Sequence, residues 1–363
     1  MTKKVKPGSE VRVALIGFGY AGRVIHAPLI SATPGLRLAV IASRQGNQAA
    51  SAYAGADVIA DPLVAIRHAD VDLVVIATPN ETHARLAEAA LRAGKHVVVD
   101  KPFTLTLTEA RGLAARSVET GRVLSVFQNR RWDSDFLGIA RELAAGRIGE
   151  VAEVRSEISR YRPEIRDRWR ERAGPGAGIW YDLAPHLIDQ SLVLFGPPET
   201  VQADLQVQRM GGSTIDWFQT VLGYGRKRVL LESSMLAAAP ATRFLVRGTK
   251  GTLLKRQGDP QEEQLVSGQN PAAPEWGRDP DPLIFVPGEV RTPTEIATPA
   301  GNYLRYYMAI RESVREEGPS PVTPQQATTV MAIIEAGIQS SDEGRVVHPE
   351  FTDAERSGWE PVA

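Results

Sequence analysis

The stretch GIWYDLAPHLIDQ, residues 178–190, contains an aspartate and a histidine, Asp182 and His186, four residues apart. If the stretch is helical, this spacing places the carboxylate and the imidazole on one face of the helix. Such a pair can ligate a metal ion, exchange protons with a substrate, or make a packed polar contact without chemistry. The chain holds only six histidines, so the pair is a candidate functional site, and the residues alone leave all three alternatives open.

A second candidate is Lys101, which directly follows the strand expected over residues 96–100 and lies in the segment VVVDKPF. Lysine is an unusual core residue, so at the end of a buried strand its ammonium group could stabilise negative charge developing on a reacting oxygen. Pro102 restricts Lys101 to extended backbone geometry and could fix its direction. The alternative is a solvated loop lysine.

The segment GFGYAG matches the pattern G-x-G-x-x-G and follows a strand expected over residues 11–17. Gly17 permits a tight turn, Gly19 lets the backbone approach a pyrophosphate, and Gly22 allows the next helix to pack on the strand. The helix directs its free N–H groups toward the phosphates. A purely structural turn is the alternative. The pattern predicts dinucleotide binding by Gly17, Phe18, Gly19, Tyr20, Ala21 and Gly22.

The end of the second expected strand, Leu36–Ala42, indicates which dinucleotide is bound. A ribose with a free 2′-hydroxyl usually meets an acidic residue about 20 residues beyond the glycines. This chain instead has Ser43 and Arg44, and no acid follows until Asp57. A hydroxyl and a guanidinium would hold a 2′-phosphate, which a carboxylate would repel. We therefore expect NADP, with NAD possible; the alternative is that Arg44 is a solvated loop residue.

The residues around these sites alternate between strand and helix patterns. Strands are expected over residues 71–79, 96–100 and 123–129, and helices over residues 81–94 and 106–121. This alternation predicts βαβ units and a doubly wound parallel sheet, with ligands beyond the carboxyl ends of the strands.

After Asn129 the alternation stops, which predicts a dinucleotide-binding domain over residues 1–129 and an α/β substrate-binding and oligomerisation domain over residues 130–363. Such a sheet can pack helices on one face and use the other for subunit contact. The polar, Pro- and Gly-rich stretch 255–282 is expected to be a surface insertion. Strands are expected within residues 151–161, 199–210, 216–225, 228–235 and 242–254, and helices over 302–317 and 324–344.

Composition excludes several classes of function. The 363 residues carry a net charge of −1 without runs of like charge, so neither nucleic acid nor a membrane is an expected partner. The chain has no cysteine, which excludes disulfides, thiolate catalysis and zinc–thiolate or iron–sulfur sites. The start, MTKKVKPGSE, lacks a signal-type apolar segment, so a cytoplasmic location is expected.

The segments GFGYAGRVIHAP, ATPNETH, VVVDKPF and YDLAPHLIDQ, in this order and spacing, resemble the glucose–fructose oxidoreductase / inositol 2-dehydrogenase family. The resemblance extends from Val11 to about Glu343, and is strongest to NADP-linked scyllo-inositol dehydrogenases. It implies an N-terminal Rossmann domain and a C-terminal α/β domain with an open, mostly antiparallel sheet. The family's strand-end Glu-Lys-Pro motif here reads Asp100-Lys101-Pro102.

The resemblance also implies roles for individual residues. Lys101, Asp182 and His186 match three family residues that converge on the substrate carbinol, which favours acid–base chemistry over metal binding for the helix pair. The implied substrate is a polyol or sugar, and the implied assembly a homodimer or homotetramer. Further expected cofactor-binding residues are Thr78, Pro79, Asn80, Asp100, Lys101, Trp169 and Arg170, and expected substrate-binding residues are Asn129, Tyr161, Arg168, Asp182 and His186. For Pro79, Asn80, Trp169, Arg170, Tyr161, Arg168 and Asn129 the alternative is a surface or packing residue.

Two other functions occur on related chains. One is a glycosidase that retains NAD and shows no net cofactor turnover. The other is a regulator that binds cofactor and sugar without chemistry and would not need Lys101, Asp182 and His186 together.

Overall fold

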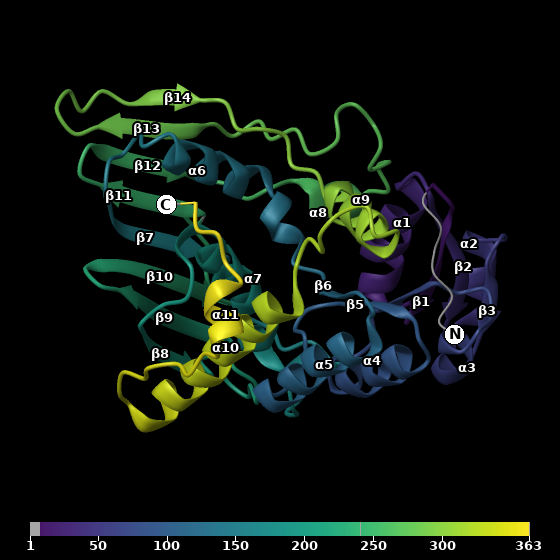
Figure 1. The fold of residues 1–363 in the computed structure, drawn as a ribbon. Coiled ribbons are helices and arrows are strands. Elements are labelled where there is room, and N and C mark those ends of the chain that lie inside the picture. The colour runs from purple at the N-terminus through teal and green to yellow at the C-terminus, as the bar shows by residue number, and fades with distance from the viewer. Residues whose placement is uncertain (1–7, 240, 363) are drawn as a thin grey trace. The chain divides into compact units, whose positions relative to one another are not determined.

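The computed structural model describes residues 8–239 and 241–362, which form two compact units (Figure 1). The first unit comprises the described residues up to Asn129, together with Gln261–Trp276 and Asn302–Thr328. The second comprises Arg130–Pro260, Gly277–Gly301 and the described residues from Thr329 onward.

The first unit is built on a six-stranded sheet in the order β3-β2-β1-β4-β5-β6, with every neighbouring pair parallel. The central strands are continuous runs of buried Val, Ile, Leu and Ala, as a sheet covered on both faces requires. The predicted doubly wound sheet is confirmed. Its strands are β1 Val11–Ile16, β2 Leu36–Ala42, β3 Asp57–Ile59, β4 Leu73–Ile76, β5 His96–Val99 and β6 Leu124–Val126.

Helices pack on both sides of this sheet (Figure 1). The local sequence explains where α5, Leu107–Thr120, begins and ends: Thr106 and Glu109 form a capping box, and Gly121 adopts the left-handed conformation with a φ of 60°. The other helices are η1 Ala21–His26, α1 Ala27–Ala32, α2 Gly46–Ala52, α3 Pro62–Ile66, η2 Asn80–Thr82, α4 His83–Arg92, α8 Gln261–Val266 and α9 Leu304–Val314.

Two segments beyond residue 129 pack with the first unit because they bury aromatic side chains there. Tyr306 and Tyr307 of α9 lie with their ring centroids 4.9 and 5.7 Å from that of Phe127. In the other segment, Trp276 is buried and donates a hydrogen bond to the side chain of Gln261 in α8. The prediction that residues 255–282 form only a surface insertion is therefore wrong for this part.

The second unit is built on an eight-stranded sheet in the order β14-β13-β12-β11-β7-β10-β9-β8. Only the β7–β10 pair is parallel, so the expected mostly antiparallel sheet is confirmed. The strands are β7 Val151–Glu157, β8 Thr200–Gln206, β9 Trp217–Tyr224, β10 Lys227–Ser234, β11 Phe244–Gly248, β12 Gly251–Lys255, β13 Leu283–Pro287 and β14 Thr294–Ile296. The last two were not expected from the sequence.

One face of this sheet is covered by helices (Figure 1). Side chains on the other face are exposed. The covered face is tightly packed: Trp180 of α7 meets the ring of Phe218 at 5.1 Å between centroids, and a Cβ at Gly337 would lie 2.4 Å from the Trp180 ring. The helices of this unit include α6 Ser134–Ala144, η4 Trp169–Glu171, α7 Gly178–Phe195 and α11 Asp353–Ser357. Most of η3 Asn129–Trp132 and of α10 Pro324–Glu343 also belongs to it, whereas Asn129 and residues 324–328 belong to the first unit.

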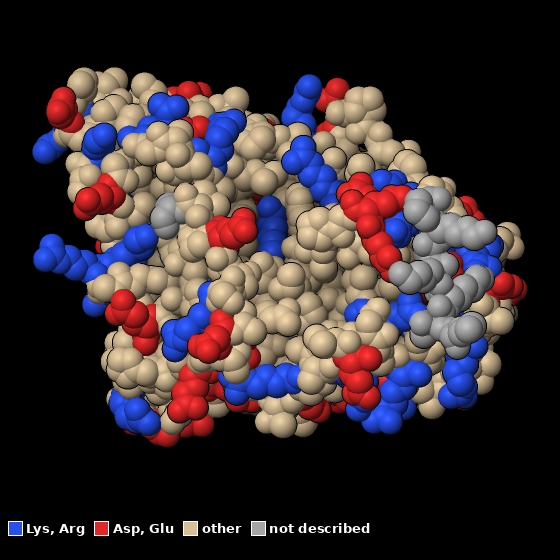
Figure 2. Space-filling model, in the orientation of Figure 1, with Lys and Arg blue, Asp and Glu red and all other residues tan. Residues whose placement is uncertain are grey.

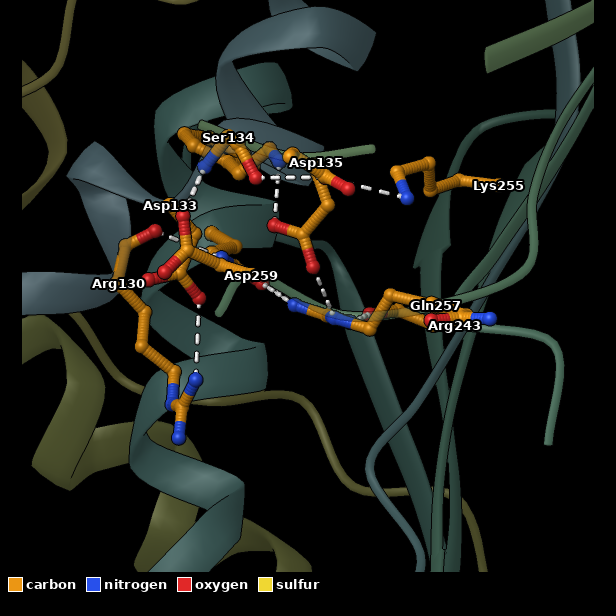
Figure 3. Close-up of polar contacts among 12 residues, drawn as sticks. Arg130, Asp133, Ser134, Asp135, Arg243, Lys255, Gln257 and Asp259 are labelled. Carbon is orange, nitrogen blue, oxygen red and sulfur yellow. Dashed lines mark hydrogen bonds and ion pairs between the residues drawn. The ribbon is translucent and has the colours of Figure 1, made fainter. Parts of the chain in front are cut away.

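A buried polar network ties the start of α6 to the end of β12 (Figure 3). Lys255 is fully buried, and its Nζ lies 2.6 Å from Asp281 Oδ2 and 3.2 Å from Asp279 Oδ2. Arg243 donates to Asp135, Ser156 and, on α7, Gln190. Each buried cation here meets a carboxylate, so the network is a structural anchor for α6 and α7.

Among the described residues, no helix combines the length and the apolar character needed to cross a membrane. Basic and acidic side chains are interspersed on the face shown in Figure 2.

Candidate active site

The loops that the sequence singled out in the first unit lie at one edge of its sheet. Backbone hydrogen bonds join them beyond the strand ends: Gly17 N donates to Ala42 O at 3.0 Å, Ala77 N to Ile16 O at 2.8 Å, and Asp100 N to Ile76 O at 2.8 Å. This edge contains the carboxyl ends of parallel strands, where doubly wound proteins bind ligands.

The three glycines fit a dinucleotide. Gly17 has a φ of +100°, and a Cβ there would lie 2.5 Å from Ala77 O. A Cβ on Gly22 would lie 2.1 Å from Gly17 O, so Gly22 is required for the helix to approach the strand. A Cβ on Gly19 would meet nothing within 4 Å, which leaves its backbone open to a pyrophosphate.

The side chains of the glycine loop differ in exposure. Phe18 is buried and meets the ring of Tyr53 edge-on at 6.0 Å, so only its backbone is offered to a ligand. Tyr20 is exposed, and its hydroxyl lies 3.4 Å from Glu262 of α8. Ala21 begins η1. The helix α8, which the sequence did not indicate, thus packs beside the predicted cofactor loop.

The loop after β2 carries no acidic side chain. Ser43 Oγ accepts the N–H of Gln45 at 2.9 Å, and Arg44 is exposed. Asp57 lies in β3, paired with Val40 rather than with the end of β2. A 2′-phosphate at this loop would therefore meet a hydroxyl and a guanidinium.

His83 joins the loops that follow β4 and β5, a role that no motif in the sequence predicted. Its Nε2 lies 3.0 Å from the carbonyl oxygen of Thr78 and its Nδ1 2.8 Å from that of Pro102. Pro79 is exposed and Asn80 is buried at the start of η2. A buried imidazole between two carbonyls fixes the spacing of two predicted cofactor loops.

Asp100 is buried beneath Lys101 and stays ionised. Burial disfavours its charged form, but His26, whose Nε2 lies 3.6 Å from Asp100 Oδ1, and the charge of Lys101 outweigh it and lower the pKa of Asp100 to about 2. Asp100 Oδ1 accepts the backbone N–H of Lys101 at 2.9 Å, and the Tyr307 hydroxyl lies 2.6 Å from His26 Nδ1. The carboxylate thus orients the backbone that carries Lys101.

In the second unit, α7 carries Asp182 and His186 one helical turn apart, as their spacing predicts. The Asp182 side chain is 21% exposed, and His186 is buried. One turn further along, both carboxylate oxygens of Asp189 accept hydrogen bonds from Arg131, at 2.7 and 2.8 Å. This buried ion pair fixes the register of the helix that presents Asp182.

Asp182 lines a pocket of the second unit, whose wall is formed by Arg160, Arg168, Arg170, Glu171, Gly178, Ile179, Asp182, Arg209, Thr214, Ile215 and Met235. Of the other predicted residues, Arg170 stacks on Trp169 at 4.8 Å from the ring centroid. Tyr161 is 60% exposed and does not line the pocket, and Asn129 is buried after β6 in the first unit.

The sequence did not identify Arg160, Arg209 or Glu171 as members of this wall. A signal was available for Arg160. If the strand pattern of β7 is continued past Glu157, every second side chain lies on the same side, and Arg160 is one of them. No group of three or more His, Asp or Glu side chains able to hold a metal ion occurs within residues 8–239 and 241–362.

Matches to known proteins agree with this division into two units. Residues 11–128 match a family model described as "Oxidoreductase family, NAD-binding Rossmann fold", and residues 140–348 match its C-terminal alpha/beta domain. The chain belongs to the GFO/IDH/MocA oxidoreductase family. The expected family membership and the expected NAD(P)-dependent dehydrogenase class are thereby confirmed. In this GFO/IDH/MocA oxidoreductase, the first match contains the glycine loop and Lys101, and the second contains Asp182 and His186.

Several members of the family are similar over nearly the whole chain. The uncharacterized oxidoreductase YdgJ of Escherichia coli is 49% identical over 92% of this chain and 96% of its own. The scyllo-inositol 2-dehydrogenase (NADP(+)) IolW of Bacillus subtilis is 34% identical over 93% and 95%. The crystal structure of an oxidoreductase from Bacillus cereus has a TM-score of 0.86 at 30% identity, covering 94% of this chain and 99% of its own.

Proposed function

We propose that this oxidoreductase uses NADP to interconvert a secondary alcohol of a cyclic polyol or sugar and the corresponding ketone. The observation that carries the proposal is the Asp182–His186 pair on α7, with Asp182 lining a pocket rich in hydrogen-bond donors. Hydroxyl-rich ligands need such convergent donors and acceptors.

Oxidation of a secondary alcohol removes a proton from the hydroxyl and a hydride from the carbon. When bound, NADP supplies the hydride acceptor. His186 takes up the hydroxyl proton, a role for which imidazole is suited near neutral pH. Asp182 accepts a hydrogen bond from a substrate hydroxyl, and Lys101 stabilises negative charge on the reacting oxygen. The proposal requires these three side chains to act on one carbinol.

The preference for NADP over NAD rests on the loop after β2. Arg44 is exposed there, Ser43 lies beside it, and no carboxylate lies between them and Asp57. A guanidinium makes strong, charge-assisted hydrogen bonds to phosphate. The NADP-linked relative IolW supports the same preference.

Scyllo-inositol and its ketone, scyllo-inosose, are the first substrates to test, because IolW resembles this chain over nearly its full length. Aldoses such as glucose and xylose come second. We expect NADP-dependent turnover when a panel of inositols and sugars is followed by the absorbance of NADPH. Absence of turnover with every polyol, sugar and keto-polyol tested in both directions would contradict the proposal. Net production of NADPH also distinguishes this reaction from that of a glycosidase that retains its NAD.

We also propose that the chain forms a homodimer or homotetramer through the helix-free face of its second sheet. Exposed side chains on this face include Arg155 of β7, Gln219 of β9 and Gln202 of β8. Light scattering coupled to size-exclusion chromatography should give twice or four times the monomer mass of 39.4 kDa. A monomer at micromolar concentration would contradict this part of the proposal.

A further inference from the structure

The pocket beside Asp182 contains more basic than acidic groups. Its volume is about 330 Å³, including space open to solvent, and every residue of its wall belongs to the second unit. The charged members of the wall are four arginines and two carboxylates: Arg160, Arg168, Arg170, Arg209, Glu171 and Asp182.

Two of the arginines are neutralised by carboxylates. Arg168 Nε lies 2.7 Å from Glu171 Oε1. Arg209 is buried, with Nε 2.9 Å from Asp216 Oδ2 and Nη1 3.1 Å from Glu171 Oε2. These guanidiniums have fixed partners, and their charges are balanced by Glu171 and Asp216.

Among the other charged groups of the wall, guanidiniums outnumber carboxylates. Asp182 lies 3.7 Å from Arg170 Nε, and its charge also acts on Arg162. Neither Arg160 nor Arg162 makes an ion pair within 4 Å with any residue that the structure describes. Burial, followed by the charges of Arg160, Arg166 and Arg168, lowers the pKa of Arg162. In the wall, Asp182 is therefore the one carboxylate left beside two guanidiniums, those of Arg160 and Arg170, while Arg162 lies on the same segment without lining the pocket.

The backbone holds Arg160 and Arg162 in place. Arg160 N donates to Ser234 O at 2.9 Å, Arg162 N donates to Met235 O at 2.7 Å, and Tyr161 bridges Leu236. In extended backbone, residues 160 and 162 face the side opposite to Tyr161, whose side chain is exposed. The two guanidiniums therefore start from a fixed backbone.

We propose that this pocket binds an anionic substituent of the substrate, so that the substrate class is a polyol or sugar that carries a carboxylate or a phosphate. The inference rests on the proposed function, because it takes Asp182 to lie at the reacting hydroxyl. A neutral hydroxyl leaves the excess positive charge uncompensated, whereas a carboxylate or phosphate accepts charge-assisted hydrogen bonds from the arginines. The N-terminal end of α7, at Gly178 and Ile179, adds the positive end of its helix dipole.

Matched substrates test the proposal. Glucose, glucuronate and glucose 6-phosphate share one ring, and myo-inositol is compared with an inositol monophosphate in the same assay with NADP. We expect kcat/KM for at least one anionic compound to exceed that of its neutral counterpart by about 10-fold or more, the equivalent of one charge-assisted hydrogen bond. Comparison of the compounds that carry a carboxylate with those that carry a phosphate shows which anion the pocket binds better. Equal kcat/KM for neutral and anionic members would overturn the inference and leave the proposed function intact.

Variants identify the side chains responsible. Arg160→Gln should lower the ratio of anionic to neutral kcat/KM by about 10-fold. Arg166→Gln is the matched control, because Arg166 is exposed on the same segment and does not line the pocket. An equal drop in that ratio for Arg160→Gln and Arg166→Gln would count against a specific subsite. So would a loss of NADPH affinity in the Arg160 variant as large as its loss of affinity for the anionic ligand.

Direct binding separates failure of this inference from failure of the proposed function. If no compound is oxidised, calorimetric titration of glucuronate, glucose 6-phosphate and glucose into the protein still tests the pocket. Binding of an anion that is at least 10-fold tighter than that of glucose, and that weakens in Arg160→Gln, supports the subsite. Equal binding of all three compounds would refute it.

Discussion

Arg170 Nε lies 3.7 Å from Asp182 Oδ1, so a guanidinium from η4 faces the carboxylate that α7 presents to the pocket. The same guanidinium stacks on Trp169. An ionised carboxylate accepts hydrogen bonds but does not donate them. Asp182 is therefore suited to hold a hydroxyl hydrogen, and the proton transfer of the proposed reaction falls to His186.

Replacing Arg44 should change the choice of cofactor. Arg44→Ala removes a charge-assisted contact to the 2′-phosphate, which costs about 1.5–3 kcal/mol, or roughly 10–150-fold in affinity. The KM for NADP should rise by this factor and the KM for NAD should change little. Ser43→Asp combined with Arg44→Ala should shift the preference toward NAD. Equal changes for both cofactors in steady-state assays would show that Arg44 is only a surface residue.

Two glycine substitutions should separate cofactor binding from folding. Gly19→Ala places its Cβ in open space, so the variant should fold normally and bind NADPH at least 10-fold more weakly, because the methyl group obstructs the pyrophosphate. Gly22→Ala places its Cβ 2.1 Å from Gly17 O and should destabilise the fold itself. Fluorescence titration of NADPH and thermal unfolding measure the two effects. Wild-type affinity in Gly19→Ala would argue against this binding mode.

Breaking the ion pair between Arg131 and Asp189 of α7 should lower the free energy of unfolding. Asp189→Asn leaves the buried guanidinium of Arg131 without its carboxylate, and removing one partner of a buried pair typically costs about 3–5 kcal/mol. Urea unfolding should show this loss, whereas the double variant Arg131→Met, Asp189→Leu should recover part of it. A loss below about 1 kcal/mol, as for an exposed pair, would mean that the pair does not anchor the helix.

His96 should make stability depend on pH. Burial, with the charge of Arg122, lowers the pKa of His96 from 6.5 to about 4, and its Nδ1 accepts the N–H of Val123. As pH falls from 6.5 to 4, the unfolded chain takes up a proton that the folded chain does not, so stability should decrease by roughly 3 kcal/mol. His96→Asn can still accept the Val123 hydrogen bond and should remove this part of the slope. An unchanged slope in urea unfolding between pH 7 and 4 would exclude His96 as its source.

The sequence predicted most of the fold because its strands are short apolar runs closed by glycine, proline or polar residues. The expected strand Leu36–Ala42 is β2 without change, and the helix expected over residues 106–121 is α5 at Leu107–Thr120. The strands β13 and β14 and the helix α8 were missed because they lie in or beside a Pro-rich polar stretch. The helix α8 is held by the contact of Gln261 with Trp276, and β13 and β14 are held by pairing with β12 and with each other, which local patterns do not encode.

The candidate site could be predicted only in part. Motif spacing located Gly17, Gly19, Gly22, Lys101, Asp182 and His186. It could not identify Arg160 or Arg209, because isolated arginines on an exposed segment resemble solvated residues until the backbone places them around one pocket. His83 and Asp189 act through contacts with residues 19 and 58 positions away in the chain, which spacing does not show.

The most direct test of the central claim is the kcat of the variants Lys101→Met, Asp182→Asn and His186→Ala on the substrate that the panel identifies, measured beside their NADPH affinity. Losing general acid–base or electrostatic help should lower kcat by about 10²–10⁴ in each variant while the dissociation constant of NADPH changes little. In double variants, kcat should fall by less than the product of the two single effects, because residues that act on one carbinol do not contribute independently. A correctly folded His186→Ala variant with near wild-type kcat would contradict the claim that this pair performs the chemistry.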